Sequence, residues 1–497
     1  MFFSKSKYCG LWQCPKIAWL QKYKPEERVI DSSVVSRMES GQKVGDLAKN
    51  IFGKYVDVTS YTDGKLDLNE MIERTREYMN VGEVNICEAS FNFNGLYCAV
   101  DILRKEGDGY SVYEVKSSTH NNAVYMADIA YQKYVLTHCG IKIIKTYLVN
   151  VNNKYVLNGD LDINGLFEIT DVFDLVEKEL YYIEDNLNNA ELLLKNDEEP
   201  KIDISVRCNT PYVCSFWKYC ARHIPTPSVF DLYRLDFDKK IEYYKKGMIS
   251  YEDVEGTKAC DNPTRARQVD FYLHDKGNYV DKNGIKDFLG TLTYPLYFLD
   301  FETIQPVIPV FQGTRPFQQI TFQYSLHYIE KESGELHHKE FLAESGEDPR
   351  RRLAERLIED IPTDVCILAY NKNFECSRIK ELAETFSDLS KDLKKIERNI
   401  KDLIVPFRKG YYYNKAMGGS FSIKSVLPAM FPNDPSLDYH NLEEVHNGGE
   451  AMDIFPKIKD MPAEEAAQAR KNLLKYCELD TYAMVKIWQE LVRVTAI

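Results

Sequence analysis

The chain has 497 residues, of which 44% are hydrophobic and 28% charged, and its formal net charge is −13. This length is typical of about three domains, and the composition excludes a largely disordered chain. No apolar run approaches the roughly 20 residues that cross a bilayer, and the N-terminus lacks the apolar stretch of a secretory signal. We therefore expect a cytoplasmic protein with no membrane partner. The negative charge argues against a broad polyanion-binding surface, but it is compatible with a local basic groove.

Residues 96–117 are predicted to form two strands joined by a Glu-Gly-Asp-Gly turn. Asp101 lies on the first strand, and Glu114 and Lys116 lie two apart on the second, where alternate residues share a face. Two carboxylates can hold a divalent cation, and the Val115 carbonyl can add an oxygen. The lysine ammonium can orient water or offset charge that develops at a phosphate. The hairpin thus suggests a metal-dependent nuclease site, with a solvated surface charge pair as the alternative.

The cysteines form a second pattern. Cys208, Cys214 and Cys220 are evenly spaced, and Cys14 begins a Cys-Pro step near the N-terminus, with Cys9 before it. Soft thiolates gathered in fours bind zinc or an iron–sulfur cluster. The spacing lacks the close Cys-x-x-Cys pair usual for zinc, and the neighbouring aromatic residues would shield a cluster. We therefore expect an iron–sulfur cluster, while zinc and the absence of a metal stay as alternatives.

The order of these features in residues 1–225 resembles that of the RecB-type PD-(D/E)XK nucleases with a four-iron cluster, such as the CRISPR-associated and AddB-type members. The matching motifs are Cys14-Pro15, Asp101, Glu114-x-Lys116, a helix with Gln132 and Tyr134, and the trio Cys208, Cys214 and Cys220. The resemblance implies a restriction-endonuclease-like domain whose two ends are clamped around one 4Fe-4S cluster by Cys14 and the trio. It also implies a catalytic metal on Asp101 and Glu114. Lys116 would assist, and Gln132 would complete the site.

Two features depart from the pattern of these nucleases. The first predicted helical stretch, residues 37–52, contains no histidine, whereas many relatives place another metal ligand there. The interval between Gln132 and Tyr134 is also shorter than the usual one. The missing histidine affects which metal the site would prefer. The shorter interval leaves the roles of Gln132 and Tyr134 open.

A second organised block covers residues 291–497, after a charged, irregular stretch at 226–290 that we expect to be a small helical bridge. The block begins with an apolar strand that ends in Asp300 and Glu302, which share one face. Further strands are predicted at residues 318–328, 339–343 and 365–370, and helices at 349–359, 374–386 and from 463 to the C-terminus. On the last helix, Tyr476 and Asp480 face the same side. This succession predicts an α/β domain of the ribonuclease H-like kind.

The block resembles the DnaQ-like, DEDD-type 3′ to 5′ exonucleases. The matching motifs are Asp300-x-Glu302, Asn371-x-x-Phe-Glu375 and Tyr476-x-x-x-Asp480. The resemblance implies four carboxylates that hold two divalent cations about 4 Å apart, and a tyrosine that orients the attacking water. The third acid is Glu375 where the family has aspartate, and Asp402 is an alternative ligand. The block also resembles a domain family of unassigned function that is often fused behind a RecB-like nuclease.

Three further segments are candidates for contact with nucleic acid. Residues 418–424 form a Gly/Ser turn that runs into a helix and ends in Lys424, which could offer backbone N–H groups and one ammonium to a phosphate. Arg315 lies in a Pro/Gly-rich loop after Glu302, and the aromatic residues 411–413 could stack on bases. An ordinary turn and core packing are the alternatives.

Together these motifs predict a DNA-processing enzyme with two metal-dependent nuclease modules that use Mg²⁺ or Mn²⁺ and act on single strands or DNA ends, with RNA as another candidate substrate. Two other classes of protein remain open. One is a nucleic-acid-binding scaffold in which one or both sites are degenerate, an alternative suggested by the missing histidine and by Glu375. The other is an interaction protein stabilised by zinc.

Overall fold

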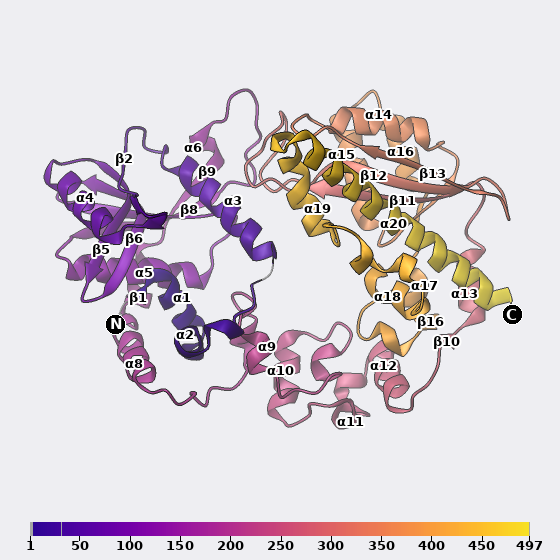
Figure 1. Cartoon of the computed structure of the whole chain (residues 1–497), viewed down its shortest axis with the longest axis horizontal. Coiled ribbons are helices and arrows are strands. Elements are labelled where there is room, and N and C mark those ends of the chain that lie inside the picture. The colour runs from indigo at the N-terminus through magenta and orange to yellow at the C-terminus, as the bar shows by residue number, and fades with distance from the viewer. Residues whose placement is uncertain (1–2, 31, 497) are drawn as a thin grey trace. The chain divides into compact units, whose positions relative to one another are not determined.

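The computed structural model describes residues 3–30 and 32–496, with the backbone alone for residues 32–34. The chain forms two compact units (Figure 1), each described by itself below. Unit 1 runs to His223 and also contains Pro306–Gln318, whereas unit 2 contains Ile224–Gln305 and resumes at Gln319. Both units combine helices with sheets, so the predicted α/β class is confirmed. Among the described helices, none is long and apolar enough to cross a membrane.

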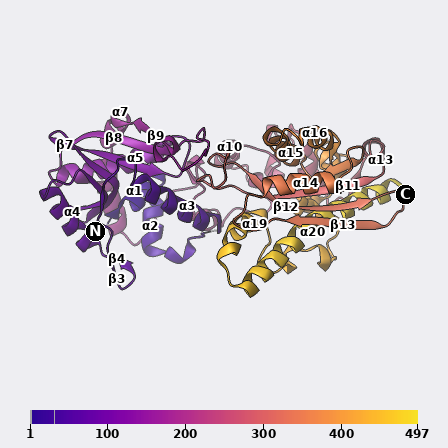
Figure 2. The same ribbon diagram turned by 90° about the horizontal axis from the view of Figure 1, so that it is seen from above.

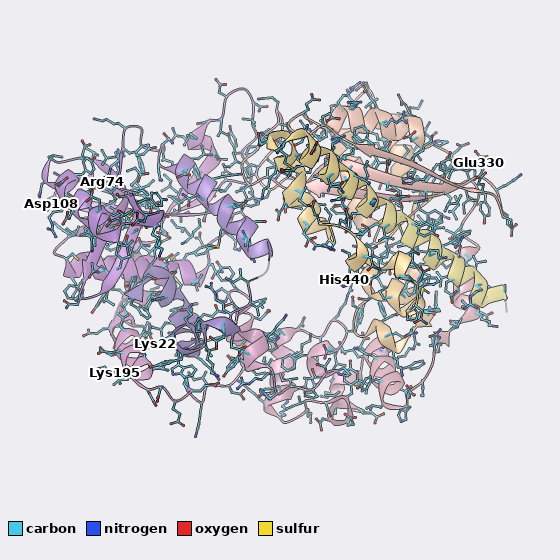
Figure 3. All side chains as sticks on the ribbon, in the orientation of Figure 1. Lys22, Arg74, Asp108, Lys195, Glu330 and His440 are labelled. Atoms are coloured by element: carbon cyan, nitrogen blue, oxygen red, sulfur yellow. The ribbon has the colours of Figure 1, made fainter. Side chains whose placement is uncertain are left out.

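Unit 1 is built around a seven-stranded sheet. Its strands are β1 (Phe3–Ser4), β2 (Val56–Asp57), β5 (Asn85–Phe93), β6 (Leu96–Glu106), β7 (Gly109–Lys116), β8 (Ile143–Val151) and β9 (Phe167–Asp171). They follow the order β2-β5-β6-β7-β8-β9, and β1 pairs with β6. The predicted hairpin is confirmed as the antiparallel pair β6 and β7, whose turn carries Asp108, labelled in Figure 3. The hairpin places Asp101 and Glu114 on neighbouring central strands.

Successive side chains along these strands point to opposite faces of the sheet, and apolar residues on both faces pack against other elements. Val112 and Leu148 pack against helices on one face, whereas Tyr113 and Val149 pack against α3 (Ser32–Ala48) and Pro306–Gln318 on the other. The helices on the first face are α1 (Lys5–Gln13), α2 (Pro15–Tyr23), α4 (Leu68–Asn80), α5 (Ala123–His138), α7 (Phe173–Leu180) and α8 (Ile183–Lys195). The smaller elements of unit 1 are β3 (Tyr61–Thr62), β4 (Lys65–Leu66), α6 (Ile163–Leu166) and α9 (Trp217–Cys220).

Unit 2 contains a five-stranded sheet in the order β13-β12-β11-β14-β15. The strands are β11 (Leu296–Ile304), β12 (Ile320–Ile329), β13 (Leu336–Leu342), β14 (Cys366–Ala369) and β15 (Ile400–Asp402). β11, β12 and β13 are antiparallel neighbours, whereas β14 and β15 continue the sheet in parallel with β11. The four strands predicted in this block are confirmed, with ends shifted by a few residues. The short β15 was not predicted.

Helices also cover both faces of this sheet, as Figure 2 shows. Tyr297, Leu299 and Phe301 point toward α14 (Arg350–Asp360), α15 (Asn373–Thr385) and α16 (Ser390–Arg398). The alternate residue Phe298 contacts Trp488 of α20 (Ala463–Ala496), with ring centroids 5.8 Å apart. Because side chains alternate along a strand, Asp300 and Glu302 point to the same side as Phe298, toward α20.

Residues 226–290 contain helices, as predicted, together with one short strand, and they belong to unit 2. Their helices are α10 (Phe237–Lys245), α11 (Tyr251–Val254), α12 (Pro263–Leu273) and α13 (Lys282–Leu289). In the same unit lie β10 (Tyr279–Val280), β16 (Tyr412–Tyr413), α17 (Val405–Arg408), α18 (Ile423–Met430) and α19 (Gly448–Ile454). β10 pairs with β16, and Tyr412 and Tyr413 are buried, which corresponds to the core-packing alternative for this aromatic run.

Candidate functional site

Three carboxylates of unit 2 converge between the central strand and the last helix. Asp300 and Glu302 lie on β11, and Asp480 lies on α20. Oxygens of these three residues lie within 4.8 Å of one another. Glu302 and Asp480 are buried, each with 7% of its surface exposed, and Asp300 is half-buried. The two motifs that the sequence placed on one strand and one helix therefore meet in a single acidic centre.

Glu375, the third acid of the predicted set, lies in the first turn of α15 and is also buried. Its negative charge raises the pKa of Asp300, so the two groups lie close enough to interact. Among the described residues, Oε2 of Glu375 has no hydrogen-bond partner. Asp402, the alternative ligand, accepts backbone hydrogen bonds from Asn371 at 2.8 Å and Ile404 at 3.2 Å. Asp402 thus holds the backbone beside Glu375, whereas Glu375 has a free carboxylate oxygen.

The acids of this centre resist ionisation. Burial, followed by the charges of neighbouring carboxylates, raises the pKa of Glu302 and that of Glu375 to about 8. Burial raises the pKa of Asp480 to about 6, and burial together with Asp480 and Glu302 raises the pKa of Asp300 well above its usual value. Negative charges held together out of water repel one another. The centre therefore favours a bound positive charge.

Two tyrosines and a lysine surround Asp480. The Tyr439 hydroxyl donates a hydrogen bond to Oδ1 of Asp480 at 2.6 Å, and a hydrogen bond from Tyr476 lowers the pKa of the same carboxyl. The Lys424 ammonium lies 4.9 Å from the ring centroid of Tyr439 and 5.2 Å from that of Tyr476, and its charge lowers the pKa of Glu302. Sequence reasoning missed Tyr439, because its short turn (Tyr439–Asn441), marked by His440 in Figure 3, carries no motif.

The other phosphate-contact candidates are placed as follows. Lys424 lies in the first turn of α18, and its ammonium donates to the His446 carbonyl at 2.8 Å. In the turn before this helix, a Cβ added to Gly419 would lie 2.0 Å from the Asp231 carbonyl oxygen, so glycine allows a close backbone approach there. Arg315 lies in the Pro306–Gln318 segment of unit 1.

Unit 1 has its own charged centre, at the β6–β7 hairpin. Oδ2 of Asp101 accepts a hydrogen bond from the Val115 amide at 2.7 Å. The Lys5 ammonium, from α1, lies 3.5 Å from Oδ1 of Asp101 and 3.1 Å from Oε1 of Glu114. Lys5 is distant in sequence, and no local pattern singles it out. The carboxylate pair predicted to hold a cation therefore holds an ammonium group.

Lys116 binds the same oxygen of Glu114 as Lys5 does, whereas Gln132 binds the other oxygen. The Lys116 ammonium donates to Oε1 of Glu114 at 2.6 Å and to Oδ2 of Asp128 at 2.7 Å. The Gln132 amide donates to Oε2 of Glu114 at 2.8 Å and to Oδ1 of Asp128 at 3.1 Å. Asp128 was not predicted, although it lies one helical turn before Gln132 on α5. Tyr134 lies on another side of that helix, with its ring centroid 4.1 Å from that of His138.

Glu88 on β5 is a further acid of this centre. The register of β5 and β6 on either side places it opposite Asp101. Its φ of 57° is in the left-handed region, which is uncommon for residues other than glycine. Burial, and then the charge of Asp101, raises the pKa of Glu88 to about 7, and burial with Asp101 and Asp128 does the same for Glu114. Glu88 lies outside residues 37–52, the stretch in which the resembled nucleases place a further metal ligand.

Four cysteines of unit 1 line one small cavity: Cys14, Cys208, Cys214 and Cys220. Their charges interact, because the other three cysteines contribute to the raised pKa of Cys214, which burial brings to about 11. Among the described residues, no three of these sulfurs lie within 4.8 Å of one another. Cys9 does not line the cavity, and its thiol instead interacts with Asp128. The predicted set of four is thus brought together, without Cys9.

Side chains hold the cysteine segments in place. The Gln13 amide donates to the carbonyls of Arg207 and Tyr212, both at 2.8 Å, and these carbonyls flank Cys208. Sγ of Cys208 accepts a hydrogen bond from the Ser205 amide at 3.4 Å. The residue before Cys14 thus fastens the later cysteine segment to the N-terminal helices.

A family model described as a domain of unknown function (DUF2779) matches residues 297–422, which include Asp300, Glu302 and Glu375 but not α20. The chain is 26% identical over 241 residues to the uncharacterized protein MG366 of Mycoplasma genitalium. It is 25% identical over 281 residues to the MG366 homolog of Mycoplasma pneumoniae, and 26% identical over 249 residues to the uncharacterized protein UU173 of Ureaplasma parvum. These matches cover 44%, 50% and 45% of this chain, and 36%, 42% and 35% of the respective relatives. The chain thus spans less than half the length of these relatives.

Proposed function

We propose that unit 2 is a metal-dependent nuclease that removes nucleotides from the 3′ end of a DNA strand. The observation that carries the proposal is the convergence of Asp300, Glu302 and Asp480, whose oxygens lie within 4.8 Å of one another. Glu375 adds a buried carboxylate oxygen without a hydrogen-bond partner among the described residues. Such a group of acids is costly to bury unless cations neutralise it.

The residues of this centre fit Mg²⁺ or Mn²⁺, because both ions prefer oxygen ligands. The free oxygen of Glu375 and the mutual repulsion of the acids are the two observations that support this fit. Two such ions, when bound, would supply an activated water and stabilise the leaving oxygen of a phosphodiester. Asp300, Glu302, Glu375 and Asp480 are the residues that would hold them.

The neighbouring side chains then have distinct roles. Burial keeps the pKa of Tyr476 far above its usual value, so its hydroxyl stays protonated. When cations bind Asp480, this hydroxyl can turn from the carboxylate and orient the attacking water. Tyr439 orients Asp480 through its hydrogen bond. The Lys424 ammonium lies beside the acids and can attract a substrate phosphate. The sheet order, with Asp300 and Glu302 on the central strand, supports a ribonuclease H-like domain.

The test is cleavage of single-stranded DNA labelled at either end by the full chain, with Mg²⁺ and then Mn²⁺. We expect products that shorten from the 3′ end. Asp300→Asn should lower this activity by about 10³-fold, and Tyr476→Phe by about 10²-fold while DNA binding is retained. Asp364→Asn, at an exposed residue of the same unit, is the control and should leave the activity unchanged.

Products that shorten from the 5′ end, or full activity of Asp300→Asn, would contradict the proposal. DNA binding without cleavage would favour the scaffold function.

A second nuclease centre is favoured in unit 1 by a specific observation. Asp101 and Glu114 together hold the Lys5 ammonium, which indicates that this carboxylate pair attracts a cation. A metal held by Asp101 and Glu114 would need a further oxygen ligand. Glu88, which lies opposite Asp101, provides one. Lys116 lies beside Glu114 and can offset charge at a substrate phosphate. We therefore propose a PD-(D/E)XK-type site, with single strands or ends of DNA as substrate.

For the cysteine cavity we propose a 4Fe-4S cluster. The four thiols line one cavity, and the buried aromatic residue Phe216 packs beside it and shields it. None of the twelve cysteines forms a disulfide, which fits the proposed location in a reducing compartment such as the cytoplasm.

A further inference from the structure

Another group of metal-ligating side chains lies on the face of the unit 2 sheet that α20 covers. Ligand atoms of His327, His338 and Glu478 lie within 4.8 Å of one another. His327 on β12 and His338 on β13 are directly paired across the two strands, and their ring centroids are 4.4 Å apart. Glu478 comes from α20, and His327 is buried. None of the three belongs to the acidic centre.

Two hydroxyl groups determine which ring nitrogens are free. The Thr481 hydroxyl donates to the Glu478 carbonyl at 3.1 Å, so it accepts from Nδ1 of His327 at 2.8 Å. It also accepts from the Ser325 hydroxyl at 2.7 Å, and Ser325 in turn accepts from Nε2 of His338 at 2.9 Å. Because each hydroxyl has one proton, this is the arrangement that satisfies every contact. Nε2 of His327 and Nδ1 of His338 keep their lone pairs, and neither has a hydrogen bond among the described residues.

We propose that His327, His338 and Glu478 bind a divalent transition metal of the zinc class, which fastens α20 to β12 and β13. Imidazole nitrogens together with a carboxylate suit Zn²⁺, and metal-binding histidines commonly donate their other N–H to a polar group, as both rings do here. Glu340 provides another nearby oxygen donor, since it lies two residues after His338 on β13 and therefore points to the same face of the sheet. Three protein ligands leave at least one coordination position for Glu340 or water.

The site has a consequence for the helix that carries the proposed nuclease residues. Glu478 lies between Tyr476 and Asp480 on α20, and Ser325 is paired with Asp300 across β11 and β12. A metal on Glu478 would therefore limit movement of this part of α20 against the sheet. The metal site itself stands on its own ligands, and it does not depend on nuclease activity.

The experiment uses the full chain after chelator treatment, with Co²⁺ or Zn²⁺ added in excess Mg²⁺, which competes at the oxygen-only sites. We expect the difference spectrum between wild type and His338→Asn to show Co²⁺ ligand-field absorption without the sulfur-to-metal charge transfer that cysteine ligands produce. Wild-type protein should bind one more Co²⁺ than His338→Asn does. Zn²⁺ should raise the melting temperature of the wild type but not that of His338→Asn. His337→Asn is the matched control, because His337 points to the opposite face and stacks on Tyr328, with ring centroids 5.0 Å apart.

Two more variants separate metal binding from a purely structural role. Glu478→Gln is a second test that does not depend on the folding of His338→Asn. It changes an exposed residue, and we expect it to lose the same Co²⁺. Thr481→Val should weaken metal binding by about 10- to 100-fold, because it removes the group that orients His327, whereas Thr481→Ser should restore it. Equal stoichiometry in wild type, His338→Asn and Glu478→Gln would overturn the proposal. An equal loss in His337→Asn would overturn it as well.

Discussion

At the scale of single residues, the two acidic centres balance their charge differently. In unit 1, Lys5 and Lys116 both form ion pairs with Glu114. In unit 2, Lys424 lies near Glu302 and Asp480, but its ammonium donates to a backbone carbonyl. The unit 2 carboxylates are therefore neutralised mainly by protons rather than by ion pairs, and divalent cations can displace these protons, which makes this centre the stronger candidate for such ions.

This difference predicts a pH effect on stability. Folded Glu302 holds its proton up to about pH 8, whereas an unfolded glutamate releases it near its ordinary pKa of 4.5. Between these values the folded state binds more protons than the unfolded state, so stability falls as the pH rises. Each unit of pKa difference corresponds to about 1.4 kcal/mol. Thermal unfolding in chelator should show this decline, and Mg²⁺ should reduce it.

Glu302→Gln tests the origin of the pH effect, because its amide cannot ionise. We expect a shallower decline of melting temperature between about pH 5 and pH 8 than in the wild type. Glu347→Gln, at an exposed glutamate of unit 2, should keep the wild-type slope. Identical slopes for all three proteins would show that the acidic centre does not control this pH dependence.

At the scale of elements, short segments far apart in sequence form each site. Cys14 lies between α1 and α2, whereas the other cavity cysteines lie near α9. The Gln13 side chain connects these segments through two backbone carbonyls. A cluster bound there would cross-link the beginning and the end of unit 1, so its loss should destabilise the whole unit.

The variant Cys214→Ala tests this connection. Anaerobically purified wild type should contain about four irons per chain, and Cys214→Ala should lose iron and unfold at a lower temperature. Cys9→Ala is a close control, since Cys9 lies on α1 outside the cavity, and it should retain the iron. Stoichiometric zinc without iron in the wild type would instead support the zinc alternative.

At the scale of the whole molecule, each unit has its own set of acids. Asp101 and Glu114 belong to unit 1, whereas Asp300 and Asp480 belong to unit 2. If both centres are active, they should be separable by single substitutions. Glu114→Ala should remove one cleavage activity and Asp300→Ala the other, with circular dichroism unchanged in both. Loss of all cleavage in either well-folded variant would argue against two independent sites.

Local periodicity determined what could be read from the sequence. Asp300 with Glu302, and Tyr476 with Asp480, were predictable because residues two apart on a strand or four apart on a helix share a face. The predicted β6–β7 hairpin and the unit 2 helices followed from the same patterns. These signals depend on neighbours in the chain and need no knowledge of the tertiary fold.

Only the tertiary structure decided which distant side chains complete each site. Lys5 reaches Glu114 from a helix more than a hundred positions earlier, and Tyr439 reaches Asp480 from a turn without a motif. His327 and His338 meet Glu478 because α20 packs across β12 and β13. Such contacts depend on how whole elements pack, and packing leaves no fixed spacing in the sequence. The sequence by itself therefore determined the strand and helix motifs, and the fold supplied their partners.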